Sequence, residues 1–182
     1  MTRKLSRFSC HQLNCYCFVK PRLSQLFYQL PLHFPYSIEL GSPAHIGPHS
    51  GAIDFLTPIN SPVFAAASGR VIEVVKAYRL PKIIQWLSSY WITRFWRGRM
   101  NYISISHRLK NIEEFSFYAH LDKNSIRVKT GDYVKVGQQI AQTGWCGWMD
   151  KPHLHFVVYT EKVKQFPLET HESLEPKWQN QF

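Results

Sequence analysis

The fold is decided by the stretch VKTGDYVKVGQQIAQTG, residues 128–144. Apolar and polar side chains alternate there around two turn pairs, Gly131-Asp132 and Val136-Gly137. Alternation with a period of two indicates a half-buried strand, and glycine between such runs marks a turn. The stretch therefore predicts two short strands separated by turns.

Strand patterns of the same kind lie on both sides of this stretch. They cover residues 52–55, 62–67, 70–75, 102–107, 115–120 and 154–160. Many short strands at close spacing, separated by turns that contain glycine, favour a small antiparallel β-sandwich or a barrel-like core. The sequence therefore predicts a mostly β fold.

One segment departs from the strand pattern. Residues 80–98 read LPKIIQWLSSYWITRFWRG, with Pro81 near the start and apolar residues at helical spacing. Proline is favoured in the first turn of a helix, so we predict a helical insertion between two strands. Its tryptophans either pack on the sheet or form an amphipathic face that seeks an interface.

The expected organisation is one domain with short flanking segments. We predict an N-terminal lead-in over residues 1–40, which is irregular or weakly helical up to about residue 35. The β-domain is expected over residues 41–165 and a C-terminal tail over 166–182. A chain of 182 residues, 45% of them hydrophobic, can form its own core without disulfide or metal staples.

Charge and composition narrow the partners only partly. The net charge of +10 favours polyanionic partners such as nucleic acid, anionic lipid or acidic wall polymers, although solubility alone explains it equally well. No apolar run is long enough to predict a transmembrane helix. The N-terminus is basic, but its apolar part is short and interrupted, unlike a typical signal peptide. The four cysteines lack zinc-finger spacing and fit either disulfides or free thiols.

Catalytic chemistry is indicated first by PHLHF, residues 152–156. Residues two apart on a strand point to the same face, so His153 and His155 project side by side. Leu154 and Phe156 then point the other way, into a core. Two imidazoles on one face allow one to bind a metal ion while the other transfers a proton.

Two further motifs precede this one. HSGAIDF, residues 49–55, places an imidazole and a carboxylate near each other, and FYAHL, residues 117–121, adds another histidine. Two histidines and one carboxylate with an open position are a usual ligand set of catalytic zinc. On a strand, Tyr118 and His120 would share a face.

In this order, the three motifs resemble the lysostaphin and LytM type of zinc endopeptidase, a family that cuts peptide cross-links in bacterial peptidoglycan. The resemblance covers roughly residues 49–159 and implies a mostly antiparallel β-structure with a groove over the sheet. It also implies one zinc ion per chain. Its ligands would be His49, Asp54 and His155.

The resemblance also implies roles for two other histidines, His153 and His120, which would flank the catalytic water. We expect His153 to take the proton of the water and return it to the leaving amine. His120 would orient the water or stabilise the oxyanion. Tyr118, Trp145 and Trp148 are expected to line the groove as substrate-binding residues.

The spacing of the first motif leaves one ligand open. Many family members have three residues between the first histidine and the aspartate, whereas four separate His49 from Asp54. His45 can also be read as the start of the motif. The sequence favours His49 and keeps His45 as the rival ligand.

The resemblance implies peptidoglycan peptides as substrate and a location in the cell envelope or outside the cell. The poor signal peptide keeps a cytoplasmic location open. The positive charge is compatible with peripheral contact with an anionic wall or membrane surface. Cross-link specificity and the oligomeric state stay open.

Three other functions fit parts of the sequence. An inactive relative could bind cell wall or regulate a partner, but every ligand position is filled. The stretch at 128–144 resembles hairpins of biotinyl and lipoyl carrier domains, but the exposed lysine context that they need is missing. The basic, aromatic composition suits nucleic acid, but no recognised motif supports a specific nucleic-acid partner.

Overall fold

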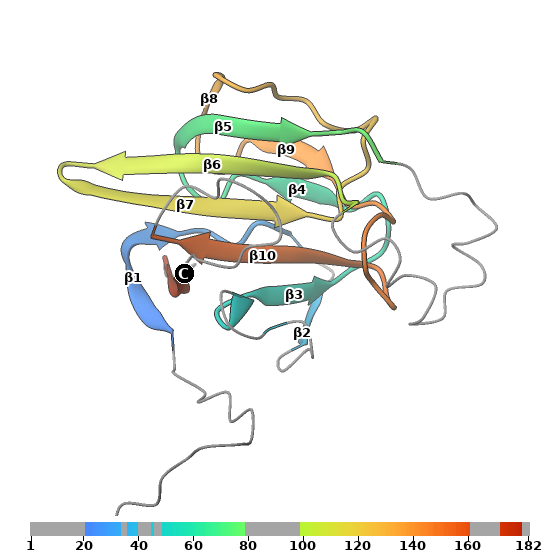
Figure 1. Cartoon of the computed structure of the whole chain (residues 1–182), viewed down its shortest axis with the longest axis horizontal. Helices are drawn as coiled ribbons and strands as arrows, with labels where there is room; N and C mark the ends of the chain where they lie inside the picture. Colours follow the sequence, from blue (N-terminus) through green and yellow to red (C-terminus); the bar gives the residue numbers. More distant parts are fainter. Residues whose placement is uncertain are drawn as a thin grey trace, which may run out of the picture.

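The computed structural model describes residues 21–33, 36–39, 45, 49–78, 99–160 and 172–179. Nearly all regular structure in these ranges is β-strand, as predicted (Figure 1). The strands are β1 Arg22–Tyr28, β2 Ser37–Glu39, β3 Ile53–Leu56, β4 Pro62–Phe64, β5 Gly69–Val75, β6 Tyr102–Leu109, β7 Ile112–Ala119, β8 Tyr133–Val134, β9 Gln139–Gln142, β10 His153–Tyr159 and β11 Ser173–Trp178.

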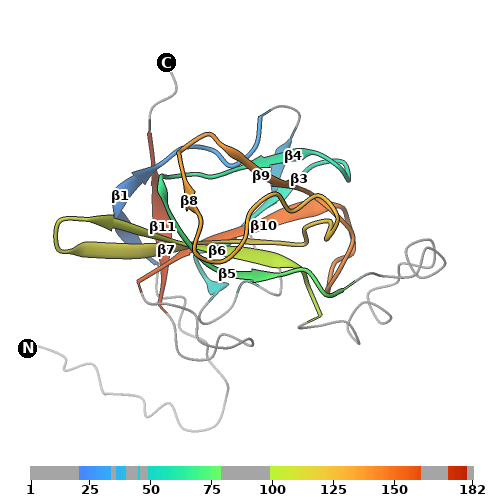
Figure 2. The ribbon, with the colours of Figure 1, turned by 90° about the horizontal axis from the view of Figure 1, so that it is seen from above.

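One large sheet carries nine of these strands, in the order β1-β11-β10-β7-β6-β5-β8, with β3 also paired to β10 and β2 to β3. The strands β4 and β9 form a separate two-stranded sheet. Figure 2 shows this small sheet as a layer on one side of the large one. The main core lies between the two layers and includes Val63, Ala141, Ile103 and Phe156.

Strand β10 is the centre of the fold, since all seven of its side chains are buried. It runs antiparallel to β7 on one side and to β3 on the other. Its even-numbered residues Leu154, Phe156 and Val158 enter the main core. Val157 and Tyr159 belong to a second buried cluster on the opposite face. The predicted alternation of faces along this strand is therefore confirmed.

The stretch at 128–144 forms the strands β8 and β9, as its pattern predicts. Gly131 and Gly137 both have positive φ, at 97° and 76°, in the turns before these strands. Glycine adopts this conformation without the steric cost that a Cβ atom would bring. The two glycines therefore allow the turns that the sequence marks.

The ends of the described chain join the large sheet. Strand β1 pairs in parallel with β11, which in turn runs antiparallel to β10. The expectation of an irregular or weakly helical segment is therefore wrong for residues 22–28. The buried Glu114 carboxylate accepts hydrogen bonds from the Gln25 and Leu26 amides and from the Tyr28 hydroxyl. This partner lies far away in the sequence, which is why local patterns miss the strand.

Several predictions fall on residues that the structure leaves undescribed. The helical insertion at 80–98 and the first twenty residues lie outside the described ranges.

Cys146 is a free, buried thiol. Within the described part of the chain, no helix has both the length and the apolar character needed to cross a membrane.

Candidate metal centre

Asp54 and His155 meet because β3 and β10 are hydrogen-bonded neighbours in register. The two residues are directly paired across the strands, and both side chains are almost fully buried. His155 Nδ1 lies 2.8 Å from the Asp54 Oδ1 atom. Alternation then sends Phe55 and Leu154 into the main core on the other face. The pairing of two strands thus places a carboxylate and an imidazole together on one face.

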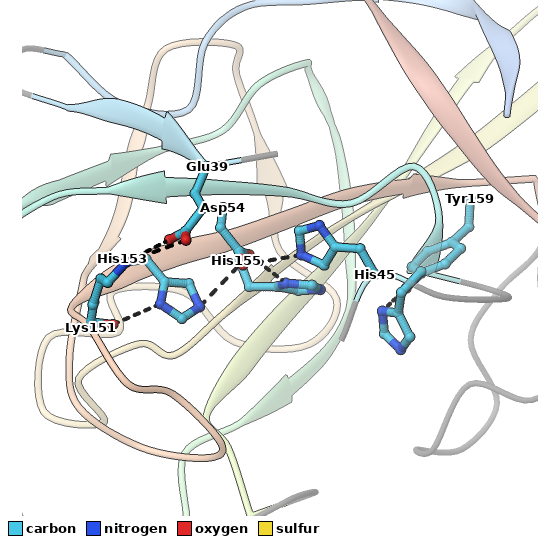
Figure 3. Close-up of polar contacts among 8 residues, drawn as sticks. Glu39, His45, Asp54, Lys151, His153, His155 and Tyr159 are labelled. Atoms are coloured by element: carbon cyan, nitrogen blue, oxygen red, sulfur yellow. Dashed lines mark hydrogen bonds and ion pairs between the residues drawn. The ribbon is translucent and has the colours of Figure 1, made fainter. Parts of the chain in front are cut away.

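His45 completes a group that could hold a metal ion. Its Nε2 atom lies 3.1 Å from Asp54 Oδ2, and its ring centroid lies 5.4 Å from that of His155. The ligand atoms of His45, Asp54 and His155 all lie within 4.8 Å of one another. Figure 3 shows the three side chains converging.

The chemistry of this group suits a cation. The His45 Nε2 atom is buried and has no hydrogen-bond partner among the described residues, although a carboxylate oxygen lies close to it. A buried polar atom without a partner is costly, whereas a metal ion between the nitrogen and the oxygen would satisfy both. Two nitrogens and one carboxylate oxygen are also a ligand set of catalytic zinc.

Asp54 is ionised in this setting. Burial alone would raise the pKa of its carboxyl, but the neighbouring imidazoles of His155 and His45, with His153 further away, hold that pKa well below its usual range. The carboxylate is therefore available as a negatively charged ligand near neutral pH.

His49 borders this group instead of belonging to it. Its ring centroid lies 5.5 Å from that of His155, and its Nδ1 atom lies 3.5 Å from the Tyr159 hydroxyl. The two candidate imidazoles, His45 and His49, thus lie almost equally far from His155. The atoms that converge on Asp54 include those of His45, the rival in the sequence analysis.

The two proposed proton-handling histidines lie side by side. The rings of His120 and His153 are 4.6 Å apart between centroids in an edge-to-face arrangement, and the His120 ring is 6.0 Å from that of His155. His153 Nε2 lies 3.7 Å from Asp54 Oδ1. The structure thus brings together the histidines of all three sequence motifs.

Both imidazoles favour the neutral form. Burial lowers the pKa of His120 well below its usual value, and the nearby His153 and His155 lower it further. Burial also lowers the pKa of His153, although the Asp54 carboxylate opposes the shift. A neutral imidazole keeps one ring nitrogen without a hydrogen, so each ring can accept a hydrogen bond or a proton through that nitrogen.

The predicted groove residues differ in their burial. Tyr118 is fully buried in the main core, where its hydroxyl accepts a hydrogen bond from the Ala66 amide, so it does not line a groove. Tyr118 and His120 do not share a face as predicted. The backbone at His120 has a φ of 62°, which ends the alternation of faces along the strand. Trp145 and Trp148 are partly exposed in the loop before β10. Their role in binding substrate stays a prediction.

Sequence reasoning missed the groups that hold the two histidines. His120 Nδ1 donates to the backbone carbonyl of Cys146 at 2.6 Å, and His153 Nδ1 donates to that of Lys151 at 2.8 Å. A backbone carbonyl is present at every residue, so no sequence signal could have identified these two acceptors.

The sequence profile of peptidase family M23 matches residues 47–167. The chain belongs to peptidase family M23. The match begins at residue 47, so His49 lies within it and His45 lies before it. The family resemblance predicted from the three motifs is therefore confirmed.

Two relatives in sequence illustrate the similarity. Peptidoglycan DD-endopeptidase ShyB from Vibrio cholerae serotype O1 is 40% identical over 111 residues, which cover 61% of this chain and 20% of that protein. Lysostaphin from Staphylococcus simulans is 32% identical over 127 residues, covering 67% of this chain and 19% of lysostaphin. The chain thus spans about a fifth of the length of these relatives.

The fold is also that of a solved M23 domain. The catalytic domain of a mutant of the prophage-encoded M23 protein EnpA from Enterococcus faecalis aligns with a TM-score of 0.50 and 24% identity. The alignment covers 77% of this chain and 91% of that domain. This similarity supports the fold of the M23 domain and carries no conclusion about substrate.

Proposed function

We propose that this protein is a zinc-dependent endopeptidase that hydrolyses peptide cross-links of bacterial peptidoglycan. The observation that carries the proposal is the meeting of Asp54, His155 and His45 beside two more buried imidazoles, His120 and His153. Membership of family M23 and the relatives named as peptidoglycan DD-endopeptidase and lysostaphin support the reaction and the substrate class.

The metal would be held by Asp54, His155 and one imidazole from the segment that carries His45 and His49. Geometry favours His45, since its Nε2 atom faces the carboxylate. The extent of the M23 match favours His49. A bound zinc ion would supply Lewis acidity at the scissile carbonyl.

His153 and His120 would handle the attacking water. Each donates its Nδ1 hydrogen to a backbone carbonyl, so in the neutral ring Nε2 is an acceptor. His153 would take one proton of the water and pass it to the leaving amine. His120 would accept a hydrogen bond from the other hydrogen of the water and would thereby orient the water. A neutral His120 has no hydrogen left to donate to an oxyanion, so this orienting role is preferred over oxyanion stabilisation.

A single experiment tests the proposal. Purified, zinc-loaded protein is incubated with isolated peptidoglycan, and the released peptides are analysed by mass spectrometry. We expect new amino termini within the cross-links from wild type and none from His155→Ala. Binding to peptidoglycan without any cleavage by the zinc-loaded wild type would instead support an inactive, wall-binding relative.

The proposed substrate also implies a place of action. Peptidoglycan lies in the cell envelope, so action there or outside the cell follows from the same proposal. The formal net charge of +10 is compatible with contact with an anionic wall polymer or membrane surface.

A further inference from the structure

One loop contacts both proton-handling histidines. The carbonyls that accept the Nδ1 hydrogens of His120 and His153 belong to Cys146 and Lys151, and both lie in residues 144–152, between β9 and β10. A carbonyl oxygen can only accept, so each ring must carry its hydrogen on Nδ1. The same loop therefore sets the tautomer of two rings, one directly after β7 and one at the start of β10.

The Cys146 end of this loop is fixed from three directions. The backbone amide of Asn101 donates to Cys146 Sγ at 3.2 Å, and the thiol donates to the Leu121 carbonyl at 3.4 Å. The Gly144 amide donates to the His120 carbonyl at 2.7 Å. The thiol is buried at 2% exposure, and burial raises its pKa to about 11, so it is a neutral donor. It anchors the backbone whose carbonyl holds the His120 ring.

Gly147 allows the loop to lie directly against the same ring. Its φ is +83°, and a Cβ atom there would lie 3.1 Å from His120 Nδ1 and 2.9 Å from Met100 Cβ. The contact with Met100 is too close for a Cβ atom, and the contact with His120 is tight enough that the ring or the loop would have to shift. The loop thus approaches the imidazole at a position where only glycine fits.

We propose that residues 144–152 are a tautomer clamp, which holds His120 and His153 with Nδ1 protonated and Nε2 as acceptor, and that Cys146 and Gly147 are positioning residues for His120. The inference rests on the proposed function for its catalytic consequence. The tautomer itself is a property of the folded chain and can be measured without substrate.

The direct measurement is nitrogen NMR of zinc-loaded protein labelled on histidine, because the two ring nitrogens of a neutral imidazole have different shifts. We expect His120 and His153 of wild type in the Nδ1-protonated form. A wild-type His120 protonated on Nε2 would overturn the proposal whatever the activity.

A matched pair of glycine variants separates the close packing of the loop at Gly147 from the strain of alanine at positive φ. Gly147→Ala and Gly131→Ala both place alanine at positive φ, but a Cβ atom at Gly131 meets nothing within 4 Å. We expect Gly147→Ala to lose the single His120 tautomer and to lower kcat by about 10- to 100-fold, with KM and zinc content close to wild type. Gly131→Ala should keep the tautomer and kcat. Equal behaviour of the two variants would overturn the clamp.

Cys146 provides a test by conservative rescue. Cys146→Ser keeps a group that can accept from Asn101 and donate to Leu121, whereas Cys146→Ala removes both bonds. We expect the serine variant to retain the wild-type tautomer and most of kcat, and the alanine variant to lose both at unchanged zinc content. An alanine variant identical to the serine variant in tautomer and kcat would contradict the role of Cys146. If wild type shows the expected tautomers but cleaves no peptidoglycan, the proposed function fails while the clamp stands.

Discussion

Two buried histidine environments lie at opposite ends of β7, and they differ in how the rings are satisfied. His107, paired in register with Glu114 near the start of β7, lies 3.0 Å from the Ser68 carbonyl through Nδ1 and 2.7 Å from the Ser116 hydroxyl through Nε2. Both ring nitrogens are used within the protein.

The histidines beyond the end of β7 differ from His107 in the hydrogen bonding of their ring nitrogens. His120 and His153 each give Nδ1 to a carbonyl and keep Nε2 as an acceptor, while His45 Nε2 has no hydrogen-bond partner among the described residues. Burial alone therefore does not mark a functional histidine. The difference lies in whether the second ring nitrogen has a partner in the protein or is directed to a shared site.

The comparison predicts opposite losses for two histidine-to-alanine changes. His155→Ala should abolish zinc binding and cleavage, because it removes one of the proposed ligands, and should leave the sheet folded. His107→Ala should keep the wild-type zinc stoichiometry and lower the melting temperature. Elemental analysis measures the zinc content, a cleavage assay measures the activity, and thermal unfolding measures the melting temperature. Zinc retained by His155→Ala would refute the site.

A smaller effect is expected where a ring acts on a proton. His153→Ala should lower kcat by about 10²- to 10⁴-fold, the usual contribution of a general base. It should keep zinc, because His153 is not one of the proposed ligands. Steady-state kinetics and metal content measured on one preparation test this. Full activity of His153→Ala would assign the proton transfer elsewhere.

The third ligand can be decided by a pair of variants. His45 and His49 lie 5.4 and 5.5 Å from the His155 ring between centroids, and catalytic zinc normally takes three protein ligands. We therefore expect only one of His45→Ala and His49→Ala to lose zinc. Zinc loss from His45→Ala would support His45 as the ligand, as the geometry favours. Zinc loss from His49→Ala would support His49, as the sequence motif favours. Loss in both, or in neither, would contradict a three-ligand site.

The fully satisfied His107 predicts a stability that depends on pH. Burial lowers the pKa of His107 to about 4, below the value of 6.5 expected when the chain is unfolded. Protons then bind preferentially to the unfolded chain as the pH falls below 6.5, so the free energy of unfolding should decrease. Between pH 7 and 4 this group should remove about 3 kcal/mol.

Urea unfolding at several pH values can isolate this effect. His107→Gln lacks the titrating group, so its unfolding free energy should fall less steeply over this pH range than that of wild type. The two slopes would be equal if His107 made no contribution. The other histidines are present in both proteins and cancel in the difference.

The smallest effect separates structure from substrate binding at Tyr118. Tyr118→Phe leaves the buried Ala66 amide without its acceptor and should lower the free energy of unfolding by about 1–3 kcal/mol. KM should not change, since the hydroxyl is buried in the core. Denaturant unfolding and steady-state kinetics test both parts. A raised KM without lost stability would return Tyr118 to the groove.

The sequence by itself determined the fold class and the central pair of the site. A strand has a two-residue period, so PHLHF had to place His153 and His155 together and send Leu154 into the core. Glycines at 131 and 137 mark the turns between the strands, because glycine adopts positive φ at little cost. These are local properties of the backbone, and local residues specify them.

Only the tertiary structure decided which distant groups meet. Pairing of β3 with β10 set Asp54 opposite His155, and a left-handed residue at His120 moved that ring away from the face of Tyr118. Strand β1 depends on Glu114, far along the chain, and the loop acceptors at Cys146 and Lys151 are backbone atoms. Contacts between remote segments and backbone carbonyls have no local sequence pattern, so folding alone brings them together.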